Sequence, residues 1–123
     1  MEYLDDKNLP QLINLVNRLS FCSPPLDAVW VSELSSLVAS AHQDPGAFCA
    51  NLNTKRIWGG AASLASQALN DNYGLPEATW QMHVREFRDL MIELGELLRT
   101  QRHAYPDIQA WLLAFHNWNN ADV

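Results

Sequence analysis

The sequence contains little positive charge. Its 123 residues include 8 Lys and Arg against 14 Asp and Glu, which gives a formal net charge of −6 at pH 7. Binding to a phosphate backbone requires a basic surface, so nucleic acid is a disfavoured partner, whereas a basic protein is a compatible one. The chain also lacks an apolar run close to the ~18 residues of a membrane span, and its N-terminus lacks a signal-peptide pattern. We therefore expect a cytoplasmic protein that does not bind membranes.

Cysteine is scarce, and metal-ligand spacings are absent from the sequence. Cys22 and Cys49 lie in different segments without a CxxC pair. The favoured interpretation is two partly buried free thiols, although two cysteines can also form one bridge. The histidines form neither an HxxxH nor an HExxH motif; they are His42, His83, His103 and His116. No metal site and no cofactor is predicted.

Catalytic motifs are also missing from the sequence. No GxSxG turn surrounds Ser63 or Ser66, and the phosphate-binding pattern GxxxxGK[ST] does not occur. Nucleophilic catalysis needs an oriented base beside the nucleophile, and no such set is recognisable. We predict no catalytic residue and no enzymatic activity. A small helical enzyme with a pocket near Trp58, Gly59, Gly60 and Arg56 is the least favoured alternative.

Helical periodicity dominates what the sequence does contain. Apolar residues recur in steps of three and four from Trp80 to Leu98, which predicts one long helix over about 76–103. Similar spacing predicts further helices at 8–20, 25–41 and 106–118. Asp44 as the N-cap and Pro45 as the first residue predict a short helix at 45–52, and the small residues from Gly59 to Ala68, within the segment 55–71, suit another helix. No segment alternates for long enough to form a strand. We therefore predict a single all-α domain over 1–123, an antiparallel bundle of five or six helices around the long helix.

The long helix carries a one-sided stripe of carboxylates opposite its apolar face. The stripe consists of Glu86, Asp89, Glu93 and Glu96, with Ile92 among them and with Arg85, Arg88 and Arg99 at its edge. Carboxylates at spacings of three, four and seven share one side of a helix and repel each other. A solvated acidic surface would explain the stripe, but Ile92 favours a contact surface for a basic partner.

The segment that begins at Lys55 combines two glycines with a run of small residues. Gly59 and Gly60, near Lys55 and Arg56, would suit an anion site formed by backbone N–H groups. Close packing of a small-residue helix against the long helix is the favoured alternative. The Trp-Gly-Gly-Ala-Ala-Ser-Leu sequence at 58–64 resembles the helix start of a family of small bacterial domains of unknown function. A small, acidic, all-helical chain also resembles bacterial toxin-immunity proteins, and neither resemblance implies a site residue.

These observations lead to one functional hypothesis and one alternative from another class. The first is a non-enzymatic immunity protein that neutralises a basic cognate toxin, possibly by occluding its active site, through Glu86, Asp89, Ile92, Glu93 and Glu96. The alternative is a structural or regulatory module that forms a homodimer through an apolar surface of Trp111, Phe115 and Trp118.

Residues 119–123 are expected to form a frayed tail.

Overall fold

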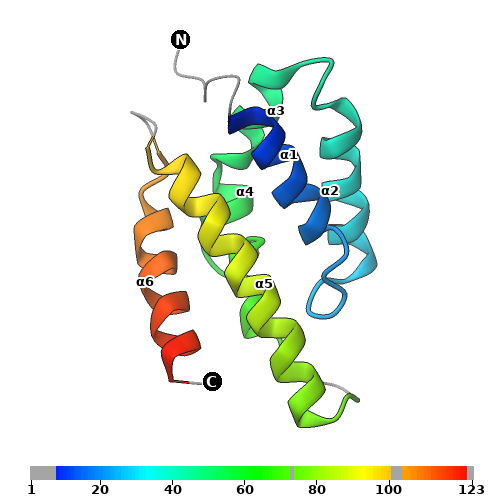
Figure 1. The fold of residues 1–123 in the computed structure, drawn as a ribbon, viewed down its shortest axis with the longest axis vertical. Helices are drawn as coiled ribbons and strands as arrows, with labels where there is room; N and C mark the ends of the chain where they lie inside the picture. The colour runs from blue at the N-terminus through cyan, green and yellow to red at the C-terminus, as the bar shows by residue number, and fades with distance from the viewer. Residues whose placement is uncertain (1–7, 73, 101–103, 122–123) are drawn as a thin grey trace.

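Every regular element of the structure is helical. The computed structural model describes residues 8–72, 74–100 and 104–121, and no strand occurs within these ranges. The elements are α1 (Asn8–Leu19), α2 (Ala28–Ser40), α3 (Pro45–Leu52), α4 (Lys55–Trp58), the 3-10 helix η1 (Ala65–Leu69), α5 (Glu77–Leu98) and α6 (Asp107–Asn120), shown in Figure 1. The predicted all-α class is confirmed.

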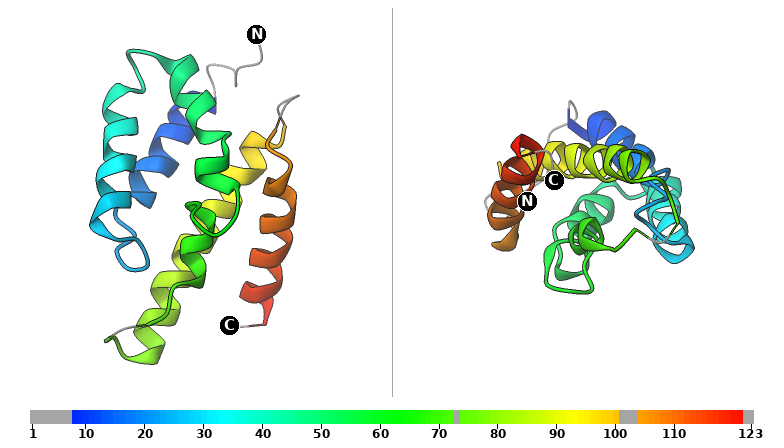
Figure 2. Two further views of the ribbon diagram at one scale, coloured as in Figure 1. Left: turned by 180° about the vertical axis from the view of Figure 1, so that it is seen from behind. Right: turned by 90° about the horizontal axis from the view of Figure 1, so that it is seen from below.

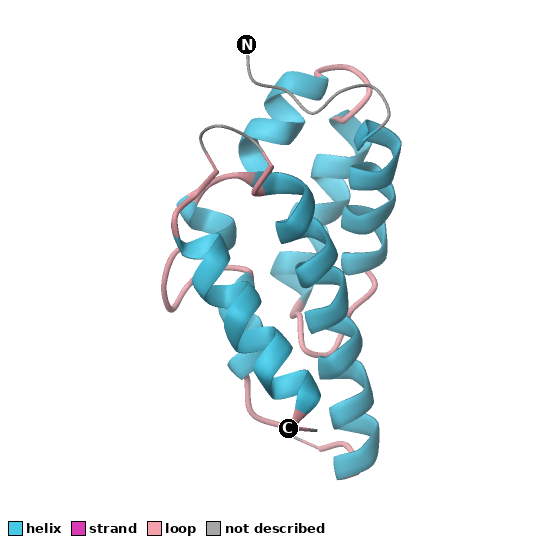
Figure 3. Cartoon of the chain, turned by 60° about the vertical axis from the view of Figure 1, so that its left-hand side comes forward, coloured by secondary structure: helices cyan, strands magenta, loops and turns pink. Residues whose placement is uncertain are grey.

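The 22-residue helix α5 lies between α1 and α6 and contacts both of them. Seen from below, α6, α5, α1 and α2 follow one another around an arc, and the segment that contains α3, α4 and η1 lies on its concave side (Figure 2). The inner side of α5 therefore faces the core. Its outer side lies on the convex surface, where no other described element covers it (Figure 3).

The inner side of α5 follows the predicted periodicity. The apolar side chains that are buried along it are Trp80, Val84, Phe87, Leu90, Met91, Leu94 and Leu98, whereas Leu97 is half-buried. From Phe87 onward the buried ones join a core that includes Leu12 of α1, Trp30 of α2 and Phe48 of α3. Burying each large apolar side chain is worth roughly 1.5–3 kcal/mol, so this pattern fixes which side of the helix turns inward.

Helix α5 ends earlier than predicted. Its last residue is Leu98, and Arg99 and Thr100 form a turn. The Thr100 hydroxyl donates to the Leu97 carbonyl at 2.7 Å, which satisfies an acceptor that the helix end leaves free. Residues 101–103, the remainder of the predicted helix, lie outside the described residues.

The helix expected over the small residues 59–68 is wrong for most of that stretch, because only its end, from Ala65, is helical. Helix α4 ends at Trp58, the chain turns through 59–64, and η1 follows. Gly60 adopts a φ of +83°, which favours glycine and interrupts a helix. The Ser63 hydroxyl donates to the Gly60 carbonyl at 2.8 Å and accepts from the Ser66 N–H at 3.2 Å. These side-chain bonds replace those of a continuous helix, although η1 does contact α5.

Aspartate caps determine where two helices begin. Asp44 accepts from the Ala47 N–H at 3.0 Å and Pro45 is the first residue of α3, as predicted. Helix α2 starts at Ala28 rather than at Pro25, because Asp27 accepts from the Trp30 N–H at 3.0 Å and serves as its N-cap.

Candidate functional site

The four predicted carboxylates lie on the outer side of α5, and we call them the acidic face: Glu86, Asp89, Glu93 and Glu96. The first three are exposed and Glu96 is half-buried. Ile92 contributes less than predicted, because it is half-buried and packs against the hydrophobic core. Arg88 and Asp89, one turn earlier, both bind Asn119 of α6, so this edge of the helix borders α6 while Asp89 itself stays exposed.

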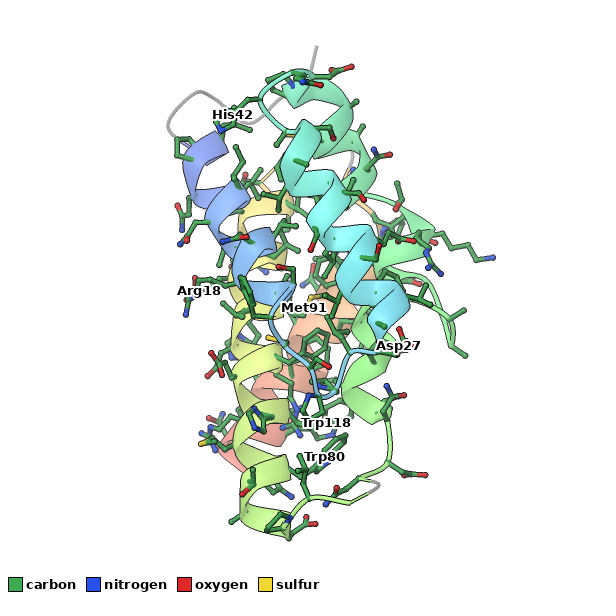
Figure 4. The ribbon with its side chains drawn as sticks, turned by 90° about the vertical axis from the view of Figure 1, so that its right-hand side faces the viewer. Arg18, Asp27, His42, Trp80, Met91 and Trp118 are labelled. Carbon is green, nitrogen blue, oxygen red and sulfur yellow. The ribbon has the colours of Figure 1, made fainter. Side chains whose placement is uncertain are left out.

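A shallow hollow of about 320 Å³ lies beside the acidic face, between α1 and α5. It is lined by Arg18 from the last turn of α1 and by Met82, Arg85, Glu86, Asp89, Leu90 and Glu93 of α5. In Figure 4 the Arg18 side chain of α1 points outward. Met91, on the side of α5 opposite the acidic face, points into the core. Met82 is 60% exposed and provides an apolar contact that the sequence analysis missed. Its position four residues before Glu86 places it on the same side of the helix.

The carboxylates of the acidic face differ in what they bind. Glu86 and Glu93 make no hydrogen bond or ion pair within the described residues. Glu96 pairs with Arg99 at 3.1 Å, one helical turn away, with both side chains partly exposed. An exposed pair of this kind contributes little to stability, but it offsets part of the negative charge at the C-terminal end of the face.

Asp89 is bound to α6 through a polar network that the sequence analysis missed. The Asn119 side chain donates from Nδ2 to Asp89 Oδ1 at 2.7 Å, and its Oδ1 accepts from Arg88 Nη1 at 3.1 Å. Arg88 is only 6% exposed, although the helical step suggested an edge position. Asn119 is 8% exposed within α6, so the prediction of a frayed tail is wrong at this residue. Its step of four residues from Phe115 continues the buried side of α6, and this spacing could have distinguished it from the exposed asparagines beside it.

The environment of Arg88 disfavours its charge. Burial lowers the pKa of the Arg88 guanidinium from its usual value, nearby Arg85 lowers this pKa further, and Asp89 raises it. The Arg88 side chain lies against Trp118, with Cζ 5.6 Å from the ring centroid. Its Nε is buried and has no hydrogen-bond partner within the described residues. Asn119 therefore supplies the main polar contact of a largely buried cation.

The two neighbouring glycines serve the geometry of the chain. A Cβ at Gly59 would lie 2.8 Å from the Tyr105 hydroxyl oxygen, and Gly60 needs its positive φ. Arg56, expected near an anion, makes two 3.0 Å hydrogen bonds to Glu33 and lies 4.0 Å above the Trp30 ring. Because Arg56 already pairs with a carboxylate, close packing and turn formation explain this segment better than an anion site.

Only part of the proposed apolar dimer surface reaches the outside of the molecule. Phe115 is fully buried, with ring centroids 5.4 Å from Trp111 and 5.9 Å from Trp118. Both tryptophans are half-buried against the core, and Trp111 Nε1 donates to the Trp58 carbonyl at 2.8 Å. Helical spacing placed the three rings on one side of α6 correctly, but that side faces the protein interior.

Other potential sites receive no support from the described part of the chain. Within it, no group of three or more His, Cys, Asp or Glu residues could hold a metal ion, and His103 lies outside it. No described helix combines the length and the apolar character needed to cross a membrane. Cys22 and Cys49 are free and buried, which confirms the predicted thiols.

Comparisons with protein-family models, curated proteins and solved structures found no match to this chain. The resemblance at 58–64 therefore stays a prediction from those residues. The function is inferred from the acidic face and its surroundings alone.

Proposed function

We propose that this chain is a non-enzymatic binding protein that docks a basic protein on the outer side of α5. The observation that carries this proposal is the acidic face, where Glu86 and Glu93 present unpaired carboxylates beside the exposed side chain of Met82. Protein interfaces commonly combine an apolar contact with a charged rim of complementary sign. A partner with basic groups around an apolar side chain fits this surface.

Within this class, we propose an immunity role in the bacterial cytoplasm. The partner is then an antibacterial toxin, and the chain blocks the active site or the path of the substrate. A toxin that cleaves nucleic acid must itself carry a basic surface to bind phosphates. The charge of the acidic face therefore favours a nuclease among the toxin classes.

The arrangement of the carboxylates suits rapid association. Glu86 and Glu93 are seven residues apart, two helical turns, and lie on the same side of α5. Their potential reaches about one Debye length, ~8 Å at physiological salt, and attracts a basic partner before contact. Glu96 contributes less because Arg99 offsets its charge.

The proposal is tested by reversing the two unpaired charges. Tagged protein is used to capture the partner, and association is then measured with the purified pair. The Glu86→Lys/Glu93→Lys variant should associate about tenfold or more slowly at low salt, with a weaker salt dependence. Cells that produce the captured toxin should survive with the wild-type chain but not with this variant.

The matched control is Asp71→Lys/Glu77→Lys, which changes the net charge equally. Both control residues are exposed and lie outside the acidic face. This control should associate at nearly the wild-type rate. If association slows equally in both variants, the effect is due to net charge and not to the acidic face. If association slows in neither variant, the acidic face is an ordinary solvated surface.

A further inference from the structure

One carboxylate of the acidic face is held by a neighbouring helix. Asp89 Oδ1 accepts a 2.7 Å hydrogen bond from Asn119 of α6, whereas Glu86 and Glu93 have no such partner within the described ranges. The bond joins residues 30 positions apart in the chain. This bond restrains the Asp89 side chain, and the residue is nevertheless exposed at the surface of α5.

The residues that hold Asp89 are buried, and the donors and acceptors of their hydrogen bonds are fixed. Asn119 Oδ1 accepts from Arg88 Nη1, so only the Nδ2 donor of the amide can face Asp89. Asn119 and Arg88 are both more than nine-tenths buried. Both side chains are therefore largely shielded from water where α5 contacts α6.

Burying the charged side chain of Arg88 costs more free energy than burying an apolar side chain of similar size. Its Nε has no hydrogen-bond partner within the described residues, and the acceptor of its Nη1 is a neutral amide. A methionine would fill the space against Trp118 without a buried charge. The Arg88 guanidinium donates to Asn119, and Asn119 donates to Asp89 of the acidic face. The buried charge therefore helps to orient a surface carboxylate, which an apolar side chain of the same size could not do.

We infer that Asp89 is the anchoring carboxylate of the docking surface and that Asn119 and Arg88 are its positioning residues. The inference rests on the proposed function. Glu86 and Glu93 attract the partner, and the free oxygen of Asp89 accepts a hydrogen bond from one of the partner's cationic groups. Because Asp89 is already oriented, it loses little conformational freedom on binding, so its contact strengthens the bound state.

The test uses a fluorescently labelled nona-arginine peptide as a defined cationic probe, with binding followed by anisotropy over a range of salt concentrations. Asn119→Leu should weaken binding about fivefold with an unchanged salt dependence, since it removes no charge. Glu93→Gln should also weaken binding, but with a shallower salt dependence. Ile108→Val, which destabilises the buried start of α6 about three helical turns before Asn119, should leave the affinity for the peptide unchanged.

The double variant Arg88→Met/Asn119→Leu separates positioning from folding. It replaces the polar network by apolar contacts, so its stability toward urea should recover relative to Asn119→Leu. Its binding should remain about fivefold weaker, because Asp89 still lacks its donor. Recovery of wild-type binding in the double variant would overturn the positioning role.

The outcome for the anchor is distinguishable from the outcome for the proposed function. Peptide binding that resists the Glu86→Lys/Glu93→Lys change would remove the acidic face as the docking surface, and both proposals would fail. Binding that responds to this charge reversal but not to Asn119→Leu would refute the anchor alone.

Discussion

At the scale of single residues, Cys22 shows how burial sets the chemistry of a side chain. Its thiol is 7% exposed and donates to the Arg18 carbonyl at 3.7 Å. Burial raises the pKa of Cys22 from 9.0 to about 11, the negative charge of Glu86 adds to this rise, and Arg18 opposes it. The thiol therefore stays protonated and unreactive at neutral pH.

This pKa predicts a loss of stability in alkaline solution. The unfolded thiol ionises near pH 9 and the folded one near pH 11, so folding stability is intact below pH 9 and falls as the pH rises to 11. The loss amounts to at most about 2–3 kcal/mol for two pKa units. Urea denaturation at pH 8 and pH 10.5 measures it, and Cys22→Val should show a smaller loss. An identical loss in both proteins would assign it to other groups.

At the scale of helices, Gly95 permits α5 to pack closely against two neighbouring helices. A Cβ at this position of α5 would lie 2.7 Å from Leu112 Cδ2 and 3.2 Å from the Trp58 ring. The absent side chain therefore lets α5 contact both α6 and α4 at one level. Close packing of a helix was expected at Gly59 and Gly60; Gly59 does lie close to Tyr105, but both glycines belong to a turn and not to a helix.

Gly95→Ala should destabilise the fold although alanine favours a helix. The gain in helix propensity is about 1 kcal/mol, whereas overpacking costs about 1–3 kcal/mol. We expect a net loss of about 1 kcal/mol in urea denaturation. Adding Leu112→Val should recover part of this loss, because it shortens the side chain nearest the new methyl group. A Gly95→Ala protein more stable than wild type would show that the helices can move apart without cost.

Local sequence signals predicted the positions of the helices better than they predicted the contacts between helices. The bounds of α3 follow from Asp44 and Pro45, which act within one turn, and the acidic face follows from the helical period of α5. The burial of Arg88 depends on how α6 aligns with α5, through a bond between residues 31 positions apart. Spacing within one helix carries no information about that alignment. The turn at 59–64 was missed because Ser63 bonds locally, which small size alone does not indicate.

At the scale of the whole molecule, the large apolar side chains that remain exposed come from different elements. Among the described residues they are Phe21, Val29, Leu69, Leu75, Met82 and Leu113. The three aromatic residues of the proposed dimer surface contact the core instead. Apolar residues exposed one at a time are ordinary on soluble monomers, whereas stable dimers usually bury a continuous apolar patch.

We therefore expect a monomer in solution without the partner. Sedimentation velocity at micromolar concentration should give a single species of about 14 kDa, from the chain mass of 13.9 kDa. The addition of moderate salt should not change it. A dimer that Leu113→Lys dissociates would instead place an interface on the outer side of α6, where Leu113 is 64% exposed.

The bond between Asp89 and Asn119 has a consequence for how this protein can change during evolution. Glu86 and Glu93 contact no other helix through a polar bond within the described residues, so each can be exchanged singly while the partner surface adapts. Asp89 is different, because its replacement leaves a buried amide and a buried guanidinium without their support. We expect lineages of this chain to exchange positions 88, 89 and 119 together and to vary 86 and 93 independently.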